Sequence, residues 1–212
     1  MATIRKGILG GFSGKVGPVV GSTWRGKDVM RSLPKKGNRI ATAEQLEQRA
    51  KFGLMTRFLA PLSGKLSVYY GQPSEDKSRM NLATSYHIRE AITGIYPDYT
   101  VDYPKVILTK GELLGLESAA AVAQAGAIMT ITWEDNAGQS QAKADDVLFS
   151  VFYNQTKGLL EWQQSAIRSA ATATVNLPNH WTGDTVHCWA SFASADDKLV
   201  ANSRYLGGLT LL

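Results

Sequence analysis

The side chains in this sequence that could do chemistry are its histidines, its one cysteine and several acidic pairs. The three histidines are His87, His180 and His187, and no two of them have the spacing of metal ligands on a helix. His187 and Cys188 could pair as a base and a nucleophile, but neighbours in a strand point to opposite faces of the sheet. We therefore expect Cys188 to be a small buried apolar group and the protein not to be an enzyme.

Two further patterns fall short of a ligand site. Gly14-Lys15 resembles the end of a phosphate-binding loop, but that loop needs Gly-x-x-x-x-Gly-Lys-Ser/Thr, and Val16 follows here. Three acidic pairs lie at expected turns, where we expect them to be solvated: Glu134-Asp135, Asp145-Asp146 and Asp196-Asp197. A calcium site made from two of these loops stays open, although the alternating ligand spacing of a dedicated calcium loop is missing. No motif predicts a cofactor or a metal.

The basic residues are concentrated at the N-terminal end. Residues 1–40 hold nine Lys or Arg and a single acidic residue, so they carry a charge of +8, whereas the rest of the chain carries −3. The same segment is rich in glycine, which disfavours a stable isolated helix, and it also contains apolar side chains. This composition indicates a basic arm that becomes ordered against a partner, with packing back on its own domain as the alternative.

We expect the arm to contact a neighbouring subunit, because its apolar groups are mixed with its charges throughout. The residues expected to make that assembly or partner contact are Phe12, Gly14, Lys15, Gly17, Trp24, Arg25 and Arg31. Nucleic acid is the alternative partner, since lysine and arginine neutralise phosphates and aromatic rings stack on bases.

A helical segment is expected over residues 41–98. Thr42-Ala43-Glu44-Gln45 matches a capping box, and apolar residues then recur at helical spacing up to Pro61. A second helix is expected from Asn81 to Thr93, with Gly94 as its stop.

From about residue 99 the pattern changes from helical to alternating, which predicts an antiparallel, immunoglobulin-like β-sandwich over 99–212. Trp133 and Trp189 would both lie in its core. The expected strands are 99–103, 106–109, 127–133, 147–153, 171–175, 186–192, 199–205 and 206–212.

The sequence also bears on location. The single cysteine excludes a disulfide within the chain, and charges and glycines interrupt any apolar core of a signal peptide. No apolar stretch is long enough to cross a bilayer. We expect a protein of the cytoplasm or of a particle assembled there, such as a virion.

Several motifs resemble a domain-of-unknown-function family of Bacteroidota. They are Gly10–Gly17, Val20–Gly26, Arg31–Pro34, Thr42-x-x-Gln45-x-x-x-Arg49-x-Lys51-Phe52, Gly94–Pro97, Leu177-Pro178 and Trp181-x-Gly183. The resemblance spans nearly the whole chain, and it implies no activity and no catalytic residues. A link to phage or phage-derived particles fits it.

The sequence thus favours a non-enzymatic structural protein that self-assembles into a homo-oligomer or with other particle subunits, possible settings being a virion or a phage-like particle. A nucleic-acid-binding protein that uses the arm is the first alternative. A carbohydrate- or protein-binding sandwich module is the second, with Trp162 or Trp181 as its platform, although core packing is the preferred role for both rings.

Overall fold

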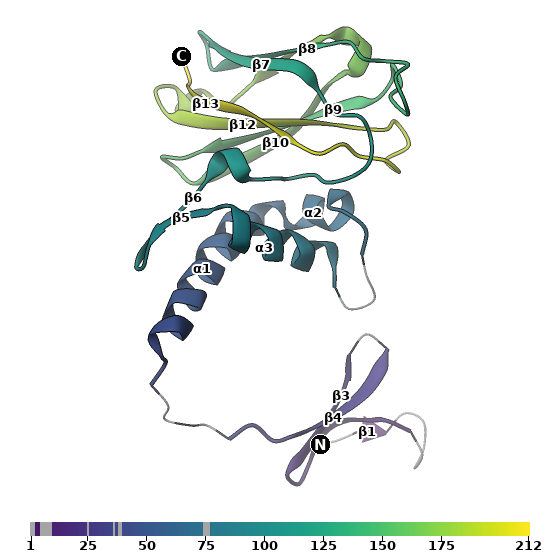
Figure 1. The fold of residues 1–212 in the computed structure, drawn as a ribbon, viewed down its shortest axis with the longest axis vertical. Coiled ribbons are helices and arrows are strands. Elements are labelled where there is room, and N and C mark those ends of the chain that lie inside the picture. The colour runs from purple at the N-terminus through teal and green to yellow at the C-terminus, as the bar shows by residue number, and fades with distance from the viewer. Residues whose placement is uncertain (1–2, 5–9, 25, 36, 38–39, 74–76) are drawn as a thin grey trace. The chain divides into compact units, whose positions relative to one another are not determined.

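The computed structural model of the chain describes residues 3–4, 10–24, 26–35, 37, 40–73 and 77–212. The chain forms two compact units, Met1–Thr42 and Ala43–Leu212. The first unit contains strands, and the second contains helices followed by a β-sandwich (Figure 1). The fold is therefore mainly antiparallel β, as the sequence predicted.

The N-terminal unit is a small antiparallel sheet. Its strands are β1 (Thr3–Ile4), β2 (Phe12–Val16), β3 (Val19–Trp24) and β4 (Lys27–Ser32), paired in chain order. Gly17 and Gly26 lie in the two tight turns with φ values of 55° and 77°, a region that favours glycine. The glycines that argued against a helix thus allow hairpins, which the sequence did not predict.

The C-terminal unit begins with three helices. They are α1 (Ala43–Leu59), α2 (Ser63–Tyr69) and α3 (Arg79–Glu90), with a 3-10 turn at Ala60–Leu62. The predicted first helix is confirmed, whereas α2 was not predicted. The predicted end of the second helix at Thr93 is wrong, because the chain leaves α3 at Glu90 and forms a hairpin of β5 (Ile92–Ile95) and β6 (Asp98–Val101).

The sandwich consists of two facing antiparallel sheets. One has the order β10-β9-β12-β13 and the other β11-β8-β7, which is an immunoglobulin-like arrangement of seven strands. The bounds are β7 (Glu117–Gln124), β8 (Ile128–Glu134), β9 (Val147–Asn154), β10 (Leu159–Ile167), β11 (Thr172–Asn176), β12 (Thr185–Ala193) and β13 (Arg204–Thr210). Three 3-10 turns, Tyr103–Lys105, Arg168–Ala170 and Asn179–Trp181, join these elements.

Strand prediction succeeded for four sandwich strands and failed for others. The chain at 106–109 is not a strand, and 98–101 pairs with β5 outside the sandwich. β7 was missed because its alanines have low β propensity, and β10 was missed because a bulge after Gln164 breaks its alternation. The two expected C-terminal strands are one strand, β13.

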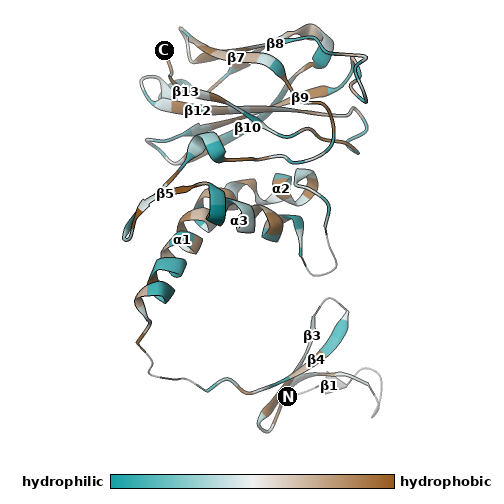
Figure 2. Ribbon diagram, viewed as in Figure 1, coloured by the Kyte–Doolittle hydropathy of each residue, from teal (hydrophilic) through white to brown (hydrophobic). Residues whose placement is uncertain are grey.

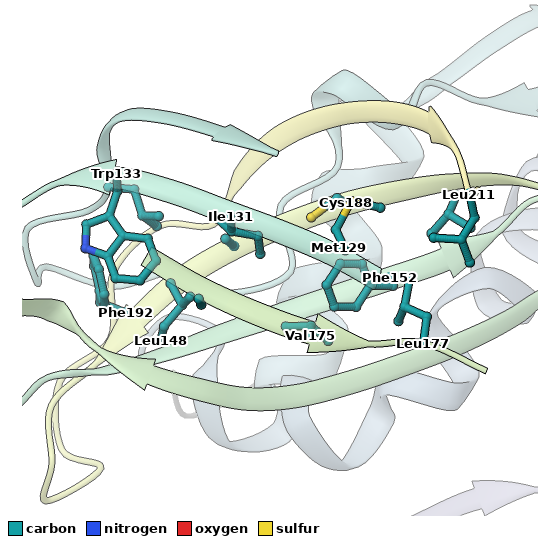
Figure 3. Packing of buried hydrophobic residues seen from close by; sticks show 14 of the residues in the cluster. Met129, Ile131, Trp133, Leu148, Phe152, Val175, Leu177, Cys188, Phe192 and Leu211 are labelled. Carbon is teal, nitrogen blue, oxygen red and sulfur yellow. The ribbon is translucent and has the colours of Figure 1, made fainter. Parts of the chain in front are cut away.

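Two hydrophobic cores lie on opposite faces of the sheet that contains β9 and β12. Between the sheets, Met129, Ile131 and Trp133 from β8 pack against β9 and β12 residues such as Phe152 and Cys188 (Figure 3). On the outer face, the helices and the 103–108 segment cover the same sheet. β9 and β12 are therefore almost fully buried, and they lack the alternation of a half-exposed strand.

The predicted place of Trp189 in the sandwich core is wrong. Trp189 is fully buried, but it packs with Leu62, Leu66 and Val151 in the helix-facing core. Its neighbour Cys188 occupies the sandwich core, so the alternation of β12 sends Trp189 to the other side. In α1, one of the helices that cover this sheet, the first turns are mainly hydrophilic (Figure 2).

Candidate assembly interface

The candidate nucleophile and base are separated by the sheet, as expected. The ring of His187 stacks on Tyr103 with centroids 3.7 Å apart, and its Nδ1 lies 2.8 Å from the Tyr205 hydroxyl. Cys188 is fully buried in the sandwich core. Burial raises the pKa of the Cys188 thiol and lowers the pKa of His187. Neither group is placed to activate the other.

His87 has a structural role in α3. Its Nδ1 lies 2.7 Å from the Ala83 carbonyl, so Nδ1 carries the proton and donates. The unprotonated Nε2 then accepts from the Ile107 amide at 3.2 Å. Burial lowers the pKa of His87, and the neutral ring joins α3 to the segment that covers the sheet.

The acidic pairs divide between solvent and core. In the part of the chain that the structure describes, no three His, Cys, Asp or Glu residues are grouped so that they could hold a metal ion. Asp196 and Asp197 lie in a turn, as predicted. The prediction that Asp146 is solvated is wrong, because its side chain is fully buried and pairs with Arg168 at 3.0 Å.

The Arg168 side chain is the centre of a buried polar network that sequence reasoning missed. Besides Asp146, it donates to the Asn136 side chain and to the Leu114 carbonyl at 2.9 Å. Its guanidinium also lies 4.0 Å from the centre of the Phe192 ring. A lone arginine carries no sequence signal of burial, since the residue type is usually exposed.

The remaining candidate is the N-terminal sheet, whose two faces follow from the pairing register. Val20 lies opposite Lys15 on β2 and opposite Arg31 on β4, so these three side chains share one face. Trp24 opposite Lys27, and Ser22 opposite Val29, continue that face along the hairpin. We call it the basic face: Lys15, Val20, Ser22, Trp24, Lys27, Val29 and Arg31.

The other face is partly covered by the chain itself. A Cβ atom on Gly21 would lie 2.6 Å from the Phe12 ring, so Phe12 rests directly on β3. A Cβ atom on Gly11 would lie even closer to the Asp28 side chain, and Asp28 accepts from the Thr23 hydroxyl at 3.1 Å. Phe12 therefore helps to hold the sheet together.

The residues predicted to contact a partner do not form one surface. Lys15, Trp24 and Arg31 share the basic face, whereas Phe12 and Gly14 belong to the opposite face. Gly17 occupies a turn, and Arg25 lies outside the described residues. No strands were predicted in residues 1–40 from the sequence. Only the alternation along a strand assigns each side chain to one face of a sheet, so the residues of the two faces could not be told apart.

The N-terminal sheet leaves much of its apolar surface exposed. The exposed fraction is 51% for Trp24 on the basic face, and it is 53% for Val16 and 69% for Met30 on the opposite face. All six residues of β4 are exposed. A sheet of this size has too few residues to enclose a core of its own, so its apolar groups stay exposed.

The sandwich tryptophans do not form a binding platform. Trp181 is 1% exposed and packs in the sandwich core. The Trp162 ring, on β10, packs against Tyr69 and Phe149. Core packing, the preferred role for both rings, is confirmed.

Comparisons with known proteins bear on the family and the fold. The model of DUF6266, a family of unknown function, matches residues 11–207, which confirms the resemblance found in the sequence. No curated protein matches the chain. A solved fn3 domain of the human collagen alpha-1(XX) chain is similar with a TM-score of 0.33 and 10% identity, over 46% of this chain and 84% of that one. No helix in the described ranges is long and apolar enough to cross a membrane.

Proposed function

The chain belongs to the DUF6266 family, and we propose that it is a non-enzymatic structural protein that self-assembles through its N-terminal unit. The observation that carries this proposal is the basic face, which joins cations to exposed apolar side chains on one small sheet. The basic face is complementary to a partner surface that is both apolar and acidic. The C-terminal unit of a neighbouring copy fits by charge, because residues 41–212 carry −3 against +8 for residues 1–40.

Each part of the basic face has a separate role in this contact. Val20 and Val29 supply apolar area at its centre, and Trp24 supplies a large ring at its end. Lys15 and Arg31 flank Val20 and would pair with carboxylates of the neighbour. A virion or a phage-like particle is a setting in which such repeated subunit contacts are used.

The test is the native mass of the full chain by light scattering, with negative-stain images of the same sample freed of nucleic acid. We expect a regular oligomer for the wild type and a smaller species for Lys15→Glu/Arg31→Glu. The matched control is Lys143→Glu/Lys198→Glu, which reverses two exposed charges of the sandwich and keeps the oligomer. A monomer at low and high salt, or an oligomer that survives deletion of residues 1–42, contradicts the proposal.

Nucleic acid is the second candidate partner, and the same face favours it. Lys15, Lys27 and Arg31 could contact phosphates, and the Trp24 ring could stack on a base. Three phosphate contacts to a single strand give a slope of about −2 in log affinity against log salt. Fluorescence anisotropy with a labelled single-stranded oligonucleotide measures this slope. An affinity that does not change with salt concentration contradicts this alternative.

A further inference from the structure

The C-terminal unit contains a hollow of about 370 Å³, and its lining is unusually basic. It lies between the end of α2, one face of α3 and the start of the segment after residue 109. On α3 the lining residues follow the helical repeat of three and four positions, so they form one continuous strip. The lining is Tyr70, Gly71, Gln72, Lys77, Leu82, Ser85, Tyr86, Arg89 and Lys110.

Three cations from three parts of the chain converge on this hollow. They are Lys77 before α3, Arg89 on α3 and Lys110 beyond the hairpin, and none of them belongs to an ion pair with a described carboxylate. The other lining residues that the structure describes carry no acidic group. This concentration of positive charge stands out, because residues 41–212 as a whole carry −3.

Two of the three cations, Lys110 and Arg89, are held in position. Lys110 is fixed through its backbone, since its amide donates to the Tyr69 carbonyl at 2.9 Å and its carbonyl accepts from Gly71 at 2.7 Å. Its Nζ lies 5.9 Å from the centre of the Tyr86 ring. The Arg89 Nε donates to the Ser85 carbonyl at 3.2 Å, which leaves the guanidinium Nη groups for another acceptor.

We propose that this hollow binds the phosphate group of a small phosphorylated molecule. Lys77, Arg89 and Lys110 supply the positive charge, and the Nη groups of Arg89 supply hydrogen-bond donors. The hollow is larger than a phosphate ion, so it has room for an organic part against the apolar side chain of Leu82. The inference does not depend on self-assembly, because every residue that it uses lies in the C-terminal unit.

Thermal unfolding of the full chain tests the site with inorganic phosphate as the probe and sodium chloride at equal ionic strength as the reference. A ligand of the folded state raises the Tm in a saturable manner. We expect Lys110→Gln to raise the half-saturating phosphate concentration about tenfold, which corresponds to the loss of one charge-assisted contact. The matched control Lys143→Gln removes an exposed charge that is not part of the lining and keeps the wild-type response.

Arg89→Gln provides a second variant of the lining. Its side chain is exposed, so without phosphate this variant should be about as stable as the wild type, while its half-saturating phosphate concentration rises. Citrate serves as a carboxylate probe in a parallel titration. The proposal is overturned by a Tm rise that is equal in Lys110→Gln and the wild type, which is a general salt effect, by a response to citrate alone, or by no saturable response.

Discussion

Replacing Arg168 with methionine should destabilise the C-terminal unit by about 3–5 kcal/mol, the usual cost of breaking a buried ion pair by removing one partner. Both side chains of the Arg168–Asp146 pair are fully buried, with Nε and Oδ2 3.0 Å apart. Methionine keeps an apolar chain over Phe192 but removes every donor of the guanidinium. Asp146 would then keep one contact, the Lys143 amide at 2.9 Å, since its other oxygen already has no partner.

Urea unfolding followed by tryptophan fluorescence measures this loss, because four of the five tryptophans lie in the C-terminal unit. The unfolding slope should stay constant, so that a lower midpoint reports stability alone. Asp146→Asn added to Arg168→Met removes the uncompensated charge and should recover much of the loss. The control Lys198→Met breaks the exposed pair with Asp196 and should leave the midpoint unchanged.

The reasoning is refuted if Arg168→Met costs less than about 1 kcal/mol, the range of an exposed pair. It is also refuted if Asp146→Asn destabilises the Arg168→Met variant further. Either result would mean that water or another cation reaches Asp146 and that the pair is not isolated from solvent.

Three further outcomes follow from the structure. The buried Cys188 thiol, whose pKa burial raises, should react with a thiol reagent only after urea is added, and reaction in the native protein would contradict its place in the core. Burial lowers the pKa of His87 and of His187 in the folded protein, so as the pH falls the unfolded chain binds protons at these two residues first, near pH 6.5. The free energy of unfolding should therefore fall as the pH is lowered from about 7.5 to about 5.5. This fall should be less steep in the double variant His87→Gln/His187→Gln. Gly21→Ala places a Cβ atom 2.6 Å from the Phe12 ring, so amide hydrogen exchange should show lost protection in the N-terminal sheet, while the C-terminal unit keeps its Tm.

The sequence predicted the architecture because its local patterns were strong. The apolar repeat from residue 43 to Pro61 gave α1, and the alternating segments near Ile131 and Val175 gave two inward-facing strands. The opposite placement of His187 and Cys188 needed only the alternation of a strand. The concentration of cations in residues 1–40 was a matter of composition alone.

Tertiary contacts decided what local patterns leave open. The helices cover the outer face of the β9–β12 sheet, so Trp189 became part of a second core that no strand pattern predicts. Asp146 and Arg168, 22 positions apart, are buried together only because the loops at the end of the sandwich meet. The basic face required the register of β2, β3 and β4, and the phosphate hollow required Lys77, Arg89 and Lys110 to converge. Sequence determines which side chains are available, but these sites depend on pairs of residues distant along the chain, and folding alone brings such pairs together.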